Sequence, residues 1–476
     1  MMSKPKRLHP AAVILHIVIG IRNSLFFFIL LFVTLFDDKL LYAFLAMLAL
    51  LLLIIITSVL TWQRFTYRVE EDELRLEYGI IIRKKRFISK HRIQSIDLTQ
   101  NILHRIFKLT KVEIETAGTG AEAEASLICV TLTEGEALRA ELKSISSREQ
   151  HENEIEEEAY LAQTITRKQL LLAGATSGSI GVLLAIAGFA FSEIERFIPA
   201  NFYDDAYRWI IGLGLLIMVL FIVGTLLLLW LLGIIGTMIK YWNFTITKVD
   251  EDIVITRGLL EKKQITIPLK RIQAVGYAES VIRQPFGYAT VIAEIAGGSN
   301  EKGEDFSTVL FPIMKVEEVE AFLEKFLPMY VNKQNNMQSL PKRARKYYII
   351  RMTIPALLLL GVVFFVFPHL SWIPLILLAV CVGLSLLQHK DAGYLINGQK
   401  LLIRYRNINK VTMVLHHKRI QAFNKKQNWF HRKENLARLK LSIIGKMGLG
   451  KHYTIKELDV TDVDDLSDWY SYRKKG

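Results

Sequence analysis

Cysteine is nearly absent from this chain, which has two cysteines in 476 residues. Cys129 lies in a run typical of a strand, and Cys381 lies in a long apolar segment, so we do not expect them to pair. No spacing of cysteine and histidine is typical of a metal site. These absences exclude a disulfide framework and a zinc module, and they are consistent with a reducing compartment.

Signatures of catalysis are also missing. The chain has no Gly-Lys-Ser/Thr phosphate loop and no Gly-x-Ser-x-Gly nucleophile turn. His416 and His417 are adjacent, so in a strand their side chains would point to opposite faces, which is poor geometry for a metal. We therefore expect no catalytic residue, no metal and no cofactor, and we expect a protein that is not an enzyme.

Long apolar segments are abundant, although 22% of the residues are charged and the mean hydropathy is +0.27. A bilayer core of about 30 Å requires roughly 20 apolar residues in a helix. Six segments come close to this length: 16–36, 40–60, 170–191, 209–238, 347–367 and 372–388. Their order predicts three transmembrane hairpins, each formed by two consecutive spans.

Lysine and arginine near the span ends indicate the orientation of the hairpins. Basic residues precede the first, third and fifth spans and follow the second, fourth and sixth, whereas the hairpin turns contain few of them. Because short loops rich in Lys and Arg stay in the cytoplasm, both termini and the soluble domains are expected there. The formal net charge of +14 agrees with such a plasma membrane protein, and it is also compatible with binding to anionic lipid or nucleic acid.

An internal repeat is the strongest signal in the sequence. The tripeptide Arg-Ile-Gln at 92–94 recurs at 271–273 and 419–421, each time downstream of a predicted hairpin. The second and third copies begin 179 and 327 positions after the first, and residues around them align in the same frame. Six residues of the motif are candidates for a structural or interaction role: Arg92, Gln94, Arg271, Gln273, Arg419 and Gln421. The structural interpretation, with a core isoleucine and a glutamine that binds the backbone, is favoured over contact with head groups or a partner.

Each copy predicts several antiparallel strands followed by one helix. Residues 74–78 and 112–115 alternate apolar and polar side chains, and residues 316–327 are amphipathic. Thr133 with Glu136, and Thr461 with Asp464, have the spacing of helix caps. The predicted fold class is an α+β membrane protein with six transmembrane helices in three hairpins, each followed by a pleckstrin-homology-like (PH-like) antiparallel β domain with a C-terminal helix. The predicted boundaries are hairpin 1–61, domain 62–150, acidic linker 151–168, hairpin 169–240, domain 241–330, linker 331–346, hairpin 347–388 and basic domain 389–476.

The repeated motif, its alternating strands and its preceding hairpins resemble the YdbS/YdbT family of bacterial membrane proteins. The resemblance covers nearly the whole chain and implies bacterial PH-like domains at the plasma membrane and a role in tolerance of antimicrobial compounds. The third copy departs from the others at Arg406, where the first two have glycine, and at Glu434. The resemblance therefore does not extend a ligand site shared by all copies to the third.

The third domain is strongly basic. Between His389 and His452 it has 15 Lys and Arg residues and two acidic residues. An aromatic pair flanked by cations suits the membrane interface, so the candidate contact with anionic lipid comprises Lys425, Lys426, Trp429, Phe430, Arg432 and Lys433. A core aromatic pair beside a solvated basic face is the equally favoured alternative.

The sequence as a whole predicts a non-enzymatic multi-pass scaffold. Its expected partners are membrane lipids and a membrane protein or paralogous PH-domain protein, with no nucleic acid, since no nucleic-acid motif is present. Its process would be envelope maintenance or antimicrobial resistance, as the resemblance implies. A transporter or channel subunit is the alternative, and a polar cavity between the hairpins would favour it.

Overall fold

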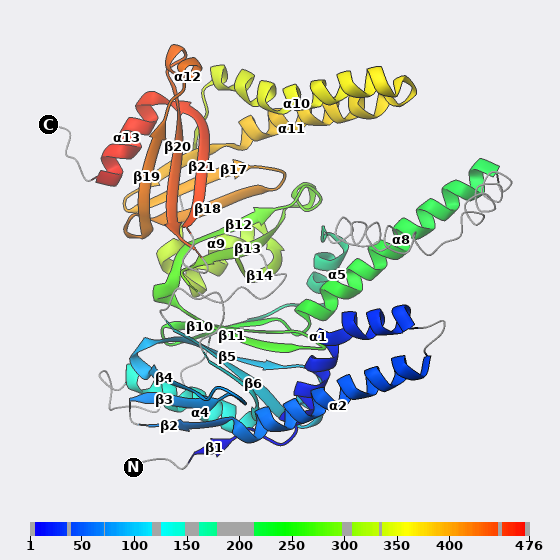
Figure 1. Cartoon of the computed structure of the whole chain (residues 1–476). Coiled ribbons are helices and arrows are strands. Elements are labelled where there is room, and N and C mark those ends of the chain that lie inside the picture. Colours follow the sequence, from blue (N-terminus) through cyan, green and yellow to red (C-terminus); the bar gives the residue numbers. More distant parts are fainter. Residues whose placement is uncertain are drawn as a thin grey trace. The chain divides into compact units, whose positions relative to one another are not determined.

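The structure is a computed structural model of the chain (Figure 1), and it describes residues 5–35, 40–70, 72–116, 125–147, 161–178, 214–297, 307–332, 336–445 and 450–471. The chain forms two compact units. Unit 1 contains residues 1–160 and 254–268, and unit 2 contains residues 161–253 and 269–476.

Five helices within the described residues are long and apolar enough to cross a membrane. They are α1 (Ala12–Leu35), α2 (Leu40–Arg64), α8 (Gly214–Tyr241), α10 (Arg345–Val366) and α11 (Trp372–Asp391). In unit 1, α1 packs closely on α2, because a Cβ atom on Gly20 would lie 2.6 Å from Cγ2 of Ile54. The predicted third span begins in α5 (Arg167–Ala175), and most of its remainder lies outside the described residues.

Unit 1 contains two antiparallel sheets around one apolar core. The first sheet has the order β1-β2-β3-β4, and the second includes β7-β6-β5-β11-β10. Leu74, Leu76 and Ile88 of the first sheet pack with Val112, Leu127 and other side chains of the second, and Leu138 and Leu142 of α4 close the core. The elements are β1 (Lys6–Arg7), β2 (Thr66–Val69), β3 (Glu73–Tyr78), β4 (Lys84–Ser89), η1 (Lys90–Arg92), β5 (Ile93–Gln100), α3 (Ile102–Ile106), β6 (Leu109–Thr116), β7 (Ala125–Thr131), α4 (Leu132–Ser147), β10 (Asp252–Arg257) and β11 (Lys262–Pro268).

Unit 2 has a seven-stranded sheet of order β14-β13-β12-β18-β17-β16-β15 and a three-stranded sheet of order β19-β20-β21. Leu401, Met413 and Leu415 pack with Leu439 and Ile455, and Val463 and Leu466 of the last helix cover this core. The elements are β8 (Leu161–Thr164), β9 (Thr245–Val249), η3 (Leu269–Arg271), β12 (Ile272–Glu279), η4 (Gln284–Phe286), β13 (Tyr288–Ile295), β14 (Thr308–Lys315), α9 (Val316–Phe326), η5 (Pro328–Tyr330), β15 (Gln338–Ser339), η6 (Lys342–Ala344), η7 (Pro368–Leu370), β16 (Gly393–Asn397), β17 (Lys400–Arg406), β18 (Lys410–His416), η8 (His417–Arg419), β19 (Ile420–Lys426), α12 (Trp429–Lys433), β20 (Leu436–Ile444), β21 (Gly450–Asp459) and α13 (Val460–Ser471).

Sheets join neighbouring copies of the repeat. In unit 1, β5 of the first copy pairs with β11 of the second, and in unit 2, β12 of the second copy pairs with β18 of the third. The first antiparallel strands of one copy thus extend the second sheet of the preceding copy, with β11 and β10 beside β5 and with β18 and β17 beside β12 (Figure 1). The sequence predicts the strands but not this exchange of edges.

Short strands precede the apolar helices, and two of these strands lie in segments for which the sequence predicts only linkers. β8 lies in the predicted acidic linker and pairs with β9, and β15 lies in the second predicted linker and pairs with β16. β1 pairs with β2 in the same way. The described ends of these linkers therefore belong to sheets, because their backbone groups extend an exposed edge.

The helix caps differ from the predicted ones by two residues. The hydroxyl of Thr131 accepts a hydrogen bond from the backbone N–H of Glu134, and Asp459 accepts one from that of Thr461, both at 3.3 Å. The predicted caps Thr133 and Thr461 therefore lie inside α4 and α13. Both helices start directly after a strand, so the last strand residue becomes the cap.

Candidate membrane-contact sites

The Arg-Ile-Gln motif forms the same structural feature in all three copies. Each arginine ends a 3-10 turn, and each isoleucine begins a strand. The register of that strand shifts at the glutamine, between Ile93 and Ser95, between Ile272 and Ala274, and between Ile420 and Ala422. The motif thus places a β-bulge at the start of the second sheet, where the chain leaves the first sheet of the domain.

Contacts of the motif vary between the copies. Arg271 is buried and its Nε donates to the carbonyl of Ala296 at 2.9 Å, while Nε2 of Gln273 donates to the carbonyl of Arg271 at 3.0 Å. Arg92 and Gln421 are exposed, and Gln94 is half-buried. Arg419 lies beside Tyr330, where burial raises the pKa of the tyrosine to about 12 and the arginine opposes the rise.

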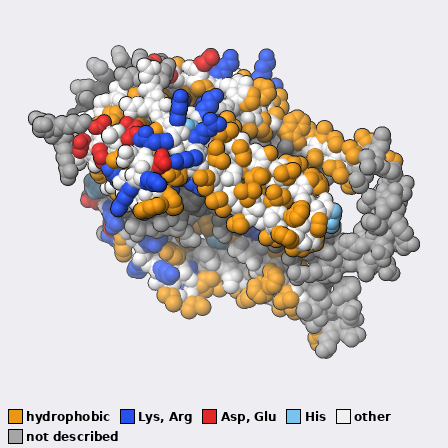
Figure 2. Space-filling model, turned by 90° about the horizontal axis from the view of Figure 1, so that it is seen from above, with side chains coloured by type: hydrophobic (Ala, Val, Ile, Leu, Met, Phe, Trp, Pro, Cys, Tyr) orange, Lys and Arg blue, Asp and Glu red, His pale blue; other side chains and the backbone are white. Residues whose placement is uncertain are grey.

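The candidate lipid residues of the third domain gather on and beside the short helix α12. Trp429 and Phe430 are 71% and 59% exposed, and their rings meet edge to face with centroids 5.1 Å apart. Lys426, Arg432 and Lys433 are also exposed. Lys425 is paired with Asp464 of α13, so its charge is partly neutralised. Figure 2 shows lysine and arginine side chains close to the apolar surface of a transmembrane-type helix pair.

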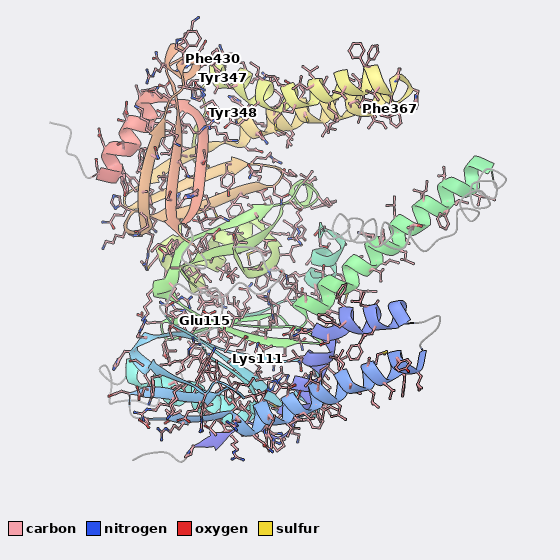
Figure 3. All side chains as sticks on the ribbon, viewed as in Figure 1. Lys111, Glu115, Tyr347, Tyr348, Phe367 and Phe430 are labelled. Carbon is pink, nitrogen blue, oxygen red and sulfur yellow. The ribbon has the colours of Figure 1, made fainter. Side chains whose placement is uncertain are left out.

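Packing against the first turns of α10 holds α12 in place. The hydroxyl of Tyr347 donates to the carbonyl of Phe430 at 3.3 Å (Figure 3). Nζ of Lys346 lies 2.7 Å from Oε1 of Glu434. The N-terminus of α12 is capped by Asn428, whose side chain accepts from the N–H of His431 at 2.8 Å. The exposed aromatic pair therefore lies at the end of α10 at which this apolar helix begins.

A buried charge cluster strengthens this junction. Glu457 of β21 is fully buried and forms an ion pair with Arg351 of α10. Its Oε1 lies 3.6 Å from Nε2 of His431 and 3.7 Å from a guanidinium nitrogen of Arg438. Burial lowers the pKa of His431, while Glu457 opposes that change. Two arginines compensate the buried carboxylate, so the cluster ties the apolar helix to the domain.

Unit 1 has a basic hollow at the corresponding end of its own helix pair. Its volume is about 530 Å³, and it is lined by Arg7, Trp62, Gln63, Arg64, Thr66 and Arg83. Nε1 of Trp62 donates to the carbonyl of Leu8 at 2.8 Å, which fixes the indole at the wall. Beside Arg83, the turn between β3 and β4 exposes Ile81 and Ile82, which are 96% and 73% exposed. The exposed Ile81 and Ile82 thus lie beside the group of arginines at the C-terminal end of α2.

In the third copy, an aspartate replaces one of the arginines that line the hollow of unit 1. Asp391 stands at the repeat position of Arg64 and accepts a hydrogen bond from Nε of the buried Arg406. Arg406 replaces a glycine, and its guanidinium also donates to the side chain of Gln284 at 2.6 Å. Sequence reasoning missed the hollow of unit 1, although Arg7 and Arg64 stand out as basic residues beside spans. Their distance in sequence from Arg83 concealed the grouping.

Comparison with known proteins agrees with the repeat and the apolar helices. The family model described as "Bacterial PH domain" matches the chain three times, at residues 25–145, 202–329 and 354–474. The UPF0699 transmembrane protein YdbT of Bacillus subtilis (strain 168) is 34% identical over 494 aligned positions, which cover 100% of this chain and 99% of that protein. The third match includes the copy that departs most from the motif pattern. The chain therefore belongs to the YdbT family of transmembrane proteins with three bacterial PH domains.

Proposed function

We propose that this protein is a non-enzymatic scaffold of the bacterial plasma membrane whose PH-like domains rest on the inner leaflet. It would have six spans in three hairpins, with both termini and the soluble domains in the cytoplasm. The observation that carries the proposal is the position of Trp429 and Phe430, exposed at the start of α10 and next to Arg432 and Lys433. Aromatic side chains flanked by cations partition into the interface of an anionic bilayer.

The hollow of unit 1 supports the same proposal independently. Three arginines line an open hollow large enough for a phosphate head group, with Arg83 also paired with Glu77 at 3.1 Å. The exposed Ile81 and Ile82 offer an apolar surface beside it. Each basic residue near an anionic surface contributes up to about 1 kcal/mol. The scaffold would hold a membrane-protein partner or a paralogous PH-domain protein, in a process of envelope maintenance or resistance to antimicrobial compounds.

Native mass spectrometry of the full chain tests the lipid contact. The protein is reconstituted with equal amounts of phosphatidylglycerol and phosphatidylcholine, released, and the retained lipids are counted. We expect the wild type to retain phosphatidylglycerol preferentially, and we expect Arg432→Gln/Lys433→Gln to reduce that preference. Lys270→Gln/Lys315→Gln is the matched control, because both lysines are exposed and lie outside the two sites. Equal retention by the two double variants would contradict the proposal.

A further inference from the structure

The two junctions between copies use one register. In the first junction, Leu98 of β5 pairs with Gln264 of β11. In the second, Tyr277 of β12 pairs with Thr412 of β18. Subtracting the repeat offsets of 179 and 327 converts Gln264 and Thr412 to position 85, and Tyr277 to position 98. Position 98 therefore faces position 85 in both junctions, and this pairing is a rule of the repeat.

In a series of three copies, this rule gives no partner copy to one strand of the first copy and one strand of the third. β4 corresponds in the repeat to β11 and β18, and β19 corresponds to β5 and β12. Within the described residues, β4 pairs only with β3, and β19 pairs only with β20. Lys84, Lys85 and Phe87 of β4 are exposed. Each edge therefore presents the backbone groups that bind a neighbouring copy inside the chain.

Charge disfavours a pairing of these two edges with each other, and the effect is reduced by Glu77 beside Lys85 and Asp464 beside Lys425. The same register would place Lys425 opposite Lys85 and Lys426 opposite Lys84. Like charges directly opposite each other destabilise a strand pair. The junction inside unit 2 has the reverse arrangement, because Lys410 of β18 lies 2.9 Å from Glu279 of β12. Head-to-tail association of two molecules through β4 and β19 is thus disfavoured.

We propose that β4 and β19 are docking edges for a strand of another PH-like domain that carries acidic residues opposite these lysines. The partner strand would run antiparallel and follow the register of the internal junctions. Acidic side chains there would form cross-strand ion pairs like that of Glu279 with Lys410, which lies one position further along the same register. The inference rests on strand register and charge, and it does not depend on contact with lipid.

A charge-reversed form of the full chain provides a defined partner. Lys84→Glu/Lys85→Glu converts β4 into an acidic edge that suits β19 of another molecule. Mass photometry in detergent should show the wild type as a monomer, whereas the variant should associate with itself and with the wild type. Lys270→Glu/Lys315→Glu, which reverses two exposed lysines away from both edges, should remain monomeric. A variant that stays monomeric with an unchanged melting temperature would overturn the proposal, and so would head-to-tail dimers of the wild type.

Disulfide trapping checks the register of the new pair. In the acidic background, Phe87→Cys on one molecule and Phe423→Cys on another should crosslink, because the rule places these residues opposite each other. Phe87→Cys with Lys426→Cys is the off-register control, with its two residues three positions apart along the strand, about 10 Å. Preferential crosslinking of the first pair supports the docking edge. Equal yields for both pairs would contradict it.

Discussion

At the scale of single residues, glycine is required in the turn after β3. Gly79 has φ of +112°, and a Cβ there would lie 2.1 Å from the carbonyl oxygen of Ile82. Gly258 has φ of +106° and an equivalent clash at 2.0 Å with Glu261. The third copy has Arg406 here because its β17 continues to that residue and pairs with Lys410. The same repeat position therefore has different backbone geometry.

Gly79→Ala should lower the free energy of unfolding by about 1–3 kcal/mol, because it adds both backbone strain and a steric clash. Gly398→Ala is the control, since Gly398 has φ of +56° but open space around the new Cβ. Left-handed strain alone should cost about 1 kcal/mol there. Denaturant unfolding in detergent measures both values, and an equal loss in the two variants would show that the clash is unimportant.

His431 predicts a pH dependence of stability in the third domain. It faces Glu457, Arg438, Arg351 and the ring of Tyr347, and burial lowers its pKa in the folded protein. The unfolded state then binds more protons below about pH 6.5, so folding stability falls as the pH decreases through that value. His431→Asn should flatten the change in unfolding free energy between pH 7 and 5. A wild-type stability that rises on acidification, relative to the variant, would contradict this sign.

At the scale of elements, α10 is coupled to the third domain through one buried ion pair. Removing the carboxylate of Glu457 leaves two arginine charges beside a buried site. Because both arginines are partly exposed, Glu457→Gln should destabilise the protein by about 1–3 kcal/mol. Arg351→Gln/Glu457→Gln should lose less than the sum of the single variants, as a double-mutant cycle by thermal unfolding would measure. Strict additivity would mean that the pair does not couple helix and domain.

Periodicity in the sequence predicted most elements but not their partners. The alternation at 74–78 and 112–115 corresponds to β3 and β6, and the amphipathic run at 316–327 corresponds to α9. Such alternation indicates which face of a strand is buried, whereas edge pairing depends on backbone groups that every residue shares. The pairing of β5 with β11 and of β12 with β18 could therefore not be predicted from the pattern of side chains. The caps were displaced because strand and helix meet without a loop.

At the scale of the molecule, the triplication of the family domain was evident from the recurring Arg-Ile-Gln frame, and the threefold family match confirms it. The grouping of site residues was only partly predictable. Trp429, Phe430, Arg432 and Lys433 adjoin in sequence, so their common exposure on α12 follows a local pattern. Arg7, Arg64 and Arg83 meet only because α2 returns the chain to β1 and β2.

The central claim is that α12 rests in the membrane interface, and its depth can be measured directly. A nitroxide is attached to Phe430→Cys in full-length protein whose native cysteines are replaced, in phosphatidylglycerol-containing nanodiscs. Lys418→Cys is the control, since it is exposed and lies beyond the opposite end of β19, a strand of about 20 Å. Power saturation should show that the label at 430 is accessible to oxygen and shielded from a water-soluble nickel complex, with the reverse at 418. Equal access of the nickel complex to both labels would place α12 in water and contradict the account.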